Sequence, residues 1–227
     1  EFDGISGEVA WDPRPISRAG SERLIRLGFD YAQRRDGAPK DGVSRVTCVD
    51  KSNVTRGCQL FRKVFNEISE EFPDIAHEAA FIDAFTMWMI RNPEWFDVVV
   101  TTNMFGDIAT DLGSVLQGGM GMAASGNIGD EHGLFEPVHG SSPKHAGKGV
   151  VNPIATLNSV QLMLEWLGMR CDDADALAAA AIIEKAISAQ ILSADELTYD
   201  LGGTASTSQV GDGIVVRVRT LLAEHYA

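Results

Sequence analysis

Two aspartates four residues apart, Asp107 and Asp111, follow a strongly apolar segment, FDVVVT. If a helix begins after Gly106, residues at this spacing project from the same helix face. Carboxylate oxygens are the ligands that Mg²⁺ and Mn²⁺ prefer, and these ions keep open positions for a substrate. The alternative interpretation makes Asp107 a helix N-cap and Asp111 a solvated surface acid. The pair by itself does not decide between the two.

A lysine at the end of a predicted strand, Lys51 in the sequence VDKSN, is a second candidate. A lysine there acts as a general base if burial or a neighbouring charge lowers its pKa from the ordinary value of ~10.4. Most lysines at strand ends are simply solvated, so the position of Lys51 alone indicates little.

A third candidate is the glycine-rich segment EPVHGSSPKHAGKG, residues 136–149. Its glycines allow the backbone to approach a ligand closely, and its histidines and lysines would attract phosphate groups. An exposed turn without a ligand explains the composition equally well. The nearby GMGMAA, residues 119–124, fits the dinucleotide pattern GxGxxA, but it follows a predicted helix instead of a strand. We interpret that match as chance or packing.

The apolar periodicity predicts helices that alternate with strands, which is typical of an α/β fold. Helices are predicted over residues 16–35, 57–72, 86–91, 154–167, 173–192 and 210–224, and strands over residues 45–49, 79–82 and 96–101. Residues 125–153 are dense in glycine and proline and predict a long irregular segment, which is more often a binding loop than a simple connection. A domain boundary is predicted near residue 120, at the run GGMG.

The composition limits the possible partners and the compartment. The chain has 227 residues, 44% of them hydrophobic, and a formal net charge of -13, which argues against nucleic acid or an anionic membrane as the main partner. Three widely spaced cysteines, Cys48, Cys58 and Cys171, favour free thiols in a reducing compartment. We find no leader at the start and no apolar run near the ~20 residues that cross a bilayer, and therefore expect a soluble cytoplasmic protein.

A family resemblance is carried by five segments in order: VDKSNV, FIDAF, FDVVVTTNMFGDIATDLGSVLQGG, GLFEPVHGSSPKHAGKGVVNPIATLNS and DLGGTAST. Together they resemble the metal-dependent β-decarboxylating dehydrogenases, which include isopropylmalate, isocitrate, homoisocitrate and tartrate dehydrogenases. The resemblance implies that family's two-domain α/β fold. It places a small, dimer-forming domain with base and metal ligands over residues 1–120, and the C-terminal part of the cofactor-binding domain over residues 121–227.

The resemblance also implies roles for the first candidates. Asp107 and Asp111 would surround Mg²⁺ or Mn²⁺ together with Asp83 of a neighbouring subunit, so that a homodimer shares its active sites. Lys51, also from the neighbour, would be the general base; it and Asp107 would carry the catalysis, and Asn53 would lie near the substrate and the nicotinamide. The reaction of the family oxidises and decarboxylates a malate-type 2-hydroxy acid with NAD or NADP. Among such substrates we favour 3-isopropylmalate over isocitrate or tartrate.

The glycine-rich segment corresponds to the family's cofactor-binding loop. The implied cofactor residues are Glu136, His139, Gly140, Ser141, Lys144, His145, Asn152 and Tyr199. NADP-preferring members often carry lysine and tyrosine where this chain has Lys144 and His145, and a later tyrosine at the position of Tyr199. These matches favour NADP modestly, since Gly203 stands where some NADP enzymes have arginine.

Two departures from the family pattern bear on activity. The family's long N-terminal segment, which supplies substrate-binding arginines, has no counterpart in the sequence. Ile5, in the sequence GISG, stands where members commonly carry the tyrosine that protonates the enol intermediate, and an isoleucine cannot donate a proton. A non-catalytic regulatory or structural relative, or an inactive fragment, is therefore the alternative to a working enzyme.

Overall fold

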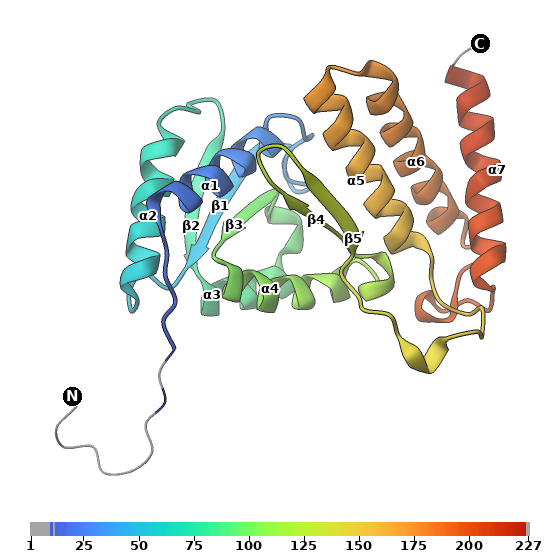
Figure 1. Cartoon of the computed structure of the whole chain (residues 1–227), viewed down its shortest axis with the longest axis horizontal. Helices are drawn as coiled ribbons and strands as arrows, with labels where there is room; N and C mark the ends of the chain where they lie inside the picture. The colour runs from blue at the N-terminus through green and yellow to red at the C-terminus, as the bar shows by residue number, and fades with distance from the viewer. Residues whose placement is uncertain (1–9, 11, 226–227) are drawn as a thin grey trace. The chain divides into compact units, whose positions relative to one another are not determined.

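The computed structural model describes residue 10 and residues 12–225, and the chain divides into two compact units (Figure 1). The first unit comprises Glu1–Thr110 and the second Asp111–Ala227, so the division falls within helix α4 (Asn103–Leu116). It lies ahead of the glycine run near residue 120, where the sequence predicts a boundary. Each unit has a hydrophobic core of its own.

The first unit is built on a three-stranded parallel sheet in the order β2-β1-β3. Its strands are β1 (Arg45–Asp50), β2 (Ala76–Phe81) and β3 (Val98–Thr101). In this register Cys48 pairs with Ala79 on one side and with Val100 on the other. Every residue of the central strand β1 is buried, whereas the edge strand β2 is mostly exposed. The sheet therefore places the chain that leaves β1 between the chains that leave β2 and β3.

Helices cover both faces of this sheet. On one face lie α1 (Arg18–Ala32) and α2 (Arg56–Ser69), with Phe29 of α1 stacked on Phe65 of α2 at 5.7 Å between ring centroids. On the other face, α3 (Ile82–Arg91) and the first part of α4 pack Phe85 and Ala109 against Val49. Both helix pairs thus bury one apolar stripe on the sheet, as amphipathic helices do.

A glycine sets how closely α1 approaches the sheet. Gly28 is buried in the middle of α1, and a Cβ atom there would overlap Cγ1 of Val100 in β3. Glycine is a weak helix former, so its presence in the helix interior is offset by the close packing that it permits.

The second unit combines a hairpin with three long helices. The hairpin strands β4 (Ala124–Ile128) and β5 (Gly133–Pro137) are antiparallel and pack on α5 (Ile154–Cys171), with Phe135 5.8 Å from Trp166 between ring centroids. Figure 1 shows α5, α6 (Ala174–Ser193) and α7 (Thr207–His225) side by side. Their core includes the fully buried Ile154 and its neighbours Ile187 and Ile214.

The prediction of one irregular segment over residues 125–153 was wrong in its first part, which forms the hairpin. The sequence did not predict these two strands because glycines interrupt the alternation of apolar and polar side chains that is typical of a strand. A Cβ atom on Gly126 or Gly133 would come within 3.1 or 2.7 Å of the Phe135 ring, so the two glycines make room for one aromatic side chain. Beyond the hairpin only a short turn, Pro143–His145, is regular before α5.

One described helix, α6, is long and apolar enough to cross a membrane by length and composition. The expectation that no segment has this character was therefore wrong. The sequence of α6 nevertheless includes Glu184 and Lys185, and Ala186 and Ile187 pack into the core of the second unit. Core helices of soluble proteins can have the same length and composition, so these two features alone do not identify a membrane span.

Candidate active site

The carboxyl ends of the three parallel strands lead to three of the residues singled out in the sequence. Strand β1 ends directly before Lys51, β2 leads into α3 with Asp83 in its first turn, and β3 leads into α4 with Asp107. Carboxyl ends of parallel strands share one edge of the sheet, where ligands of α/β proteins commonly bind. The strand order puts the Lys51 strand between the other two.

Lys51 and Asp83 form a direct ion pair at this edge. The Nζ atom of Lys51 donates to Oδ1 of Asp83 at 2.5 Å, with 26% of the lysine side chain and 66% of the aspartate side chain exposed. The hydrogen bond from Lys51 holds the pKa of the Asp83 carboxyl below its ordinary range. Lys51 also lies over the ring of Phe81, 5.8 Å from its centroid. The Asp83 side chain nevertheless stays largely exposed to solvent.

A buried carboxylate, which the sequence reasoning missed, shapes the turn that carries Lys51. Asp50 is fully buried; one oxygen accepts from the Ser52 amide at 2.8 Å and the other from Nε of Arg62 at 2.9 Å. Arg62 lies on α2, so this pair ties the turn to the next helix. The available signal was an acid at the end of a predicted strand, followed by an arginine on the next amphipathic helix.

Asn53 lies in the same turn as Lys51. Its side chain is exposed, and the amides of Val54 and Thr55 close the turn by donating to the Lys51 carbonyl at 3.0 and 2.9 Å. Asn53 can therefore present its amide to a ligand beside Lys51 without breaking a hydrogen bond of the turn.

Asp107 and Asp111 lie inside α4 and are both exposed. The helix begins at Asn103, where the Thr102 carbonyl accepts from the amide of Gly106 at 2.9 Å. Asp107 is therefore not the N-cap of this helix, which removes that half of the alternative interpretation. Since α4 is continuous between them, the two carboxylates project from one face one turn apart.

The donor set for a divalent cation is incomplete within one chain. Among residues 10 and 12–225, no group of three or more His, Cys, Asp and Glu side chains is placed to hold a metal ion. Two exposed carboxylates on one helix are hard oxygen ligands that suit Mg²⁺ or Mn²⁺, and a third protein ligand would have to come from elsewhere. Asp107 and Asp111 thus fit one part of such a site.

The second unit contains a separate cavity of about 540 Å³. Its lining residues come from the segments after α4, around the glycine-rich loop and before α7: Met120, Gly121, His139, Gly140, Ser141, Ser142, His145, Val151, Asn152, Tyr199 and Asp200. Six of the eight residues expected to bind the cofactor are among them. The other two, Glu136 and Lys144, are exposed outside the lining, with Glu136 accepting from Asn127 at 3.5 Å.

His145 and Tyr199 meet in this cavity although 54 residues separate them. Their rings stack at 5.9 Å between centroids, and the tyrosine hydroxyl lies 3.4 Å from Nε2 of His145. The other ring nitrogen, Nδ1, lies 2.8 Å from the Ser142 hydroxyl. The histidine is thus held on both sides, with its ring and the tyrosine ring forming one wall of the cavity.

Five lining residues were not predicted to bind the cofactor, and two of them, Gly121 and Asp200, bear on the shape of the cavity. Asn152 donates to Asp200 at 3.0 Å and accepts from the Ile154 amide at 3.0 Å, so its amide group is held from both ends. A Cβ atom on Gly121 would come within 2.7 Å of the Asp200 carboxylate, which makes this position suited to glycine. The GxGxxA match at Gly121 follows a helix, as the sequence predicts, and therefore lacks the strand–turn–helix context of a Rossmann fingerprint.

Ile5, the residue at the expected tyrosine position, lies outside the described residues together with the rest of GISG.

Comparison with known proteins places these features in a family. The sequence model for isocitrate/isopropylmalate dehydrogenases matches residues 2–214. The 3-isopropylmalate/3-methylmalate dehydrogenase of Methanocaldococcus jannaschii is 44% identical over 223 residues, covering 96% of this chain and 64% of the relative. The homoisocitrate dehydrogenase of the same organism is 41% identical over 219 residues, covering 96% and 59%.

Solved structures agree. The isocitrate dehydrogenase of Methylococcus capsulatus superposes with a TM-score of 0.79 at 41% identity, covering 91% of this chain and 58% of that one. A β-decarboxylating dehydrogenase of Thermococcus kodakarensis gives 0.82 at 37% identity, covering 97% and 61%. The chain thus spans less than two thirds of the length of these relatives. The predicted α/β class and the family resemblance are confirmed: the chain belongs to the isocitrate/isopropylmalate dehydrogenase family.

Proposed function

We propose that this chain carries out NAD(P)-dependent, divalent-metal-dependent oxidative decarboxylation of a malate-type 2-hydroxy acid. The observation that carries the proposal is the Lys51–Asp83 pair at the carboxyl edge of the sheet, where β3 also delivers Asp107. Relatives named as 3-isopropylmalate dehydrogenases support 3-isopropylmalate as the favoured substrate over isocitrate or tartrate.

Each residue has a chemical task in this proposal. Lys51 would accept the proton of the substrate hydroxyl and Asn53 would orient the substrate beside it, while a bound nicotinamide would supply the hydride acceptor. Asp107 and Asp111, with Asp83 of a second copy, would hold Mg²⁺ or Mn²⁺. When bound, the cation polarises the hydroxyl and carbonyl oxygens and offsets negative charge that accumulates during decarboxylation. Several carboxylates and an anionic substrate meet there, so binding would need the cation.

The exposed surface of the first unit supports a homodimer with shared sites. Four large apolar side chains on α3 and α4 are about half exposed or more: Met87 50%, Ile90 60%, Met104 49% and Ile108 57%. Apolar surface of this extent commonly marks a protein contact. Because the same helices carry Asp83 and Asp107, packing of two copies through them would bring the two parts of the metal site together.

The cavity of the second unit is the proposed cofactor site. Its glycine-rich wall would admit the dinucleotide backbone, while His145 and Tyr199 would flank the adenosine ribose. The basic side chains of this loop, including Lys144, suit an added phosphate and favour NADP over NAD modestly. Residues 121–227 would then form the C-terminal part of the cofactor-binding domain, and residues 1–120 would form the dimer-forming domain. The expected compartment of the protein is the cytoplasm.

The test is formation of reduced nicotinamide from 3-isopropylmalate, isocitrate and tartrate, each with NAD and NADP, in the presence of Mn²⁺. Turnover with one combination of substrate and cofactor would identify both, and excess chelator should abolish that turnover. Lys51→Met should abolish it, whereas Lys63→Met, on the exposed face of α2, should leave it unchanged. Absence of turnover in protein shown to be folded and dimeric would contradict the proposal.

The alternative is a non-catalytic relative or an inactive fragment. Ile5 at the expected tyrosine position, and relatives of which the chain covers only 57–64%, favour it. Retention of Lys51, Asp83, Asp107 and Asp111 argues against it, because folding requires none of these exposed or half-exposed side chains. An intact mass measured on material from the source organism would separate a fragment from a complete non-catalytic subunit.

A further inference from the structure

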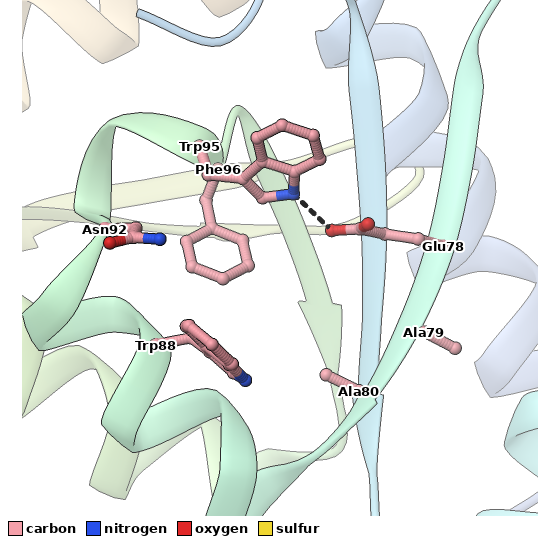
Figure 2. Close-up of a pocket in the computed structure, with 7 residues that line it drawn as sticks. All are labelled: Glu78, Ala79, Ala80, Trp88, Asn92, Trp95 and Phe96. Carbon is pink, nitrogen blue, oxygen red and sulfur yellow. Dashed lines mark hydrogen bonds between the residues drawn. The ribbon is translucent and has the colours of Figure 1, made fainter. Parts of the chain in front are cut away.

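A cavity of about 330 Å³ lies beside the edge strand β2 in the first unit (Figure 2). Its lining residues come from β2, from α3 and from the short 3-10 helix Pro93–Trp95 with the residues that flank it: Glu78, Ala79, Ala80, Trp88, Asn92, Trp95 and Phe96. None of them takes part in the reaction proposed above, so the cavity needs an explanation of its own.

Three aromatic rings form much of the wall. Figure 2 shows the rings of Trp88, Trp95 and Phe96 gathered between Asn92 and the β2 residues. Phe96 is anchored by an edge contact with Phe85, 5.0 Å between ring centroids. The two tryptophans remain 41% and 39% exposed, which is high for the largest aromatic side chain. The exposed part of each tryptophan ring is therefore accessible to a ligand in the cavity.

A carboxylate with neutral partners stands opposite these rings. Oε1 of Glu78 accepts from the Trp95 indole nitrogen at 3.0 Å and from the hydroxyl of the buried Thr47 at 3.0 Å. Within the described part of the chain, none of the salt bridges involves Glu78. Two neutral donors hold this side chain in place, and its negative charge is left without a paired cation.

The neighbouring arginines show that both tryptophans already contact cations. The buried Arg45 guanidinium lies 3.8 Å from the Trp95 ring centroid and is paired with Asp41 at 3.0 Å, so it is committed to that contact. Arg91 lies 5.8 Å from the centroid of Trp88 and is exposed, which makes it a weaker and displaceable neighbour.

We propose that this cavity binds a small organic cation of the alkylammonium class. The cationic head would lie against the rings of Trp88, Trp95 and Phe96, with its charge opposite Glu78. Aromatic walls combined with a carboxylate are the chemistry that recognises quaternary and alkylated ammonium groups. The volume is at the lower end of small-molecule sites, which fits a compact ligand better than a protein segment. The net charge of -13 also attracts cations to this chain.

The test is a titration of the full ¹⁵N-labelled chain with choline, followed through the tryptophan indole N–H resonances. The chain has four tryptophans, and Trp→Phe variants assign their signals. We expect the Trp88 and Trp95 signals to move in a saturable way and the Trp166 signal, in the second unit, to stay. The uncharged isostere 3,3-dimethylbutan-1-ol should bind about tenfold more weakly or worse, because it lacks the charge.

Variants separate the charge from the shape of the site. Glu78→Gln keeps an acceptor for Trp95 and Thr47 and should weaken choline binding about tenfold. Trp88→Ala, at a half-exposed position, should weaken it by a similar factor, and Glu224→Gln, on the second unit, should change nothing. Unmoved indole signals, equal binding of the uncharged isostere, or an unchanged Kd in Glu78→Gln would overturn the proposal. Because the site shares no residue with the proposed active site, this result does not depend on turnover.

Discussion

Lys51 and Asp83 are 32 residues apart in the sequence, yet the lysine nitrogen donates to the aspartate at 2.5 Å. The two residues follow the ends of β1 and β2, which are neighbours in the parallel sheet. A potential proton acceptor and a potential metal ligand are thereby held against each other within a single chain. The metal ligands on α4 are not gathered with them into one cluster among the described residues.

The first prediction concerns the charge of Asp83. Lys51→Met should raise the pKa of the Asp83 carboxyl toward its ordinary value of about 3.9, since the hydrogen bond from Lys51 lowers it. NMR titration of the aspartate carboxyl carbons measures the shift, with Lys63→Met as the control. Because the folded-state pKa is depressed, the pair stabilises the fold above the unfolded pKa, and that contribution disappears as the pH falls through the folded pKa. If the pKa of Asp83 were the same in Lys51→Met and in Lys63→Met, the ion pair between Lys51 and Asp83 would be contradicted.

The second prediction concerns the buried partner of Arg62. Arg62→Met should lower the free energy of unfolding by about 3 kcal/mol, because it leaves the fully buried Asp50 carboxylate without its cation. Urea unfolding measures the change. Arg26→Met is the matched control, since Arg26 and Glu71 form a solvent-exposed pair at 2.7 Å whose loss should change the free energy of unfolding little. Equal effects of the two substitutions would show that burial of Asp50 is not decisive.

The third prediction concerns Gly28 in α1, where helix propensity and close packing have opposite effects on stability. Alanine normally stabilises a helix interior relative to glycine by about 1 kcal/mol. Gly28→Ala should instead destabilise the protein by about 1–3 kcal/mol, because the new methyl group overlaps Val100. Gly211→Ala in α7 meets open space and should stabilise by up to about 1 kcal/mol. Thermal and urea unfolding compare the two, and a stabilising Gly28→Ala would refute the close approach of α1 to β3.

The fourth prediction concerns the thiols. Cys48 and Cys58 are fully buried and Cys171 is exposed, so a thiol reagent should modify one cysteine per native chain at neutral pH and none in Cys171→Ser. Burial raises the pKa of Cys48 to about 12. The neutral thiol is thus favoured in the fold, and its contribution to stability, complete below the unfolded pKa, should fade as the pH rises toward 12. Rapid modification of Cys48 before unfolding would contradict the burial.

The fifth prediction concerns the cavity of the second unit. His145→Ala removes the ring that stacks on Tyr199 and should weaken NADP binding about tenfold. The effect on NAD binding should be smaller, because NAD lacks the added phosphate that the basic side chain of His145 would contact. Titration of the reduced cofactors by fluorescence measures both constants without turnover. His132→Ala, on the hairpin turn, is the control. Equal losses for the two cofactors would argue against a role of His145 in choosing between them.

The sequence by itself determined the type and order of most helices and strands. A segment with one buried face repeats its apolar residues with the period of a helix or of a strand, and this period is visible in the sequence. The runs RVTCV and FDVVVT became β1 and β3, and the amphipathic patterns became helices. It also supplied the ordered motifs that carry the family resemblance. It failed at the hairpin of β4 and β5, where glycines replace the alternating side chains, and it placed the start of α4 after Gly106 instead of at Asn103.

Only the tertiary structure decided which distant residues meet. The strand order β2-β1-β3 brings Asp83 to Lys51, and the packing of α2 on the sheet brings Arg62 to the buried Asp50. In the second unit, the same kind of long-range packing stacks His145 on Tyr199. Local periodicity shows which face of a segment is buried but not which other segment buries it. Pairing of strands and docking of helices depend on the whole core, and those contacts place the side chains that could do chemistry.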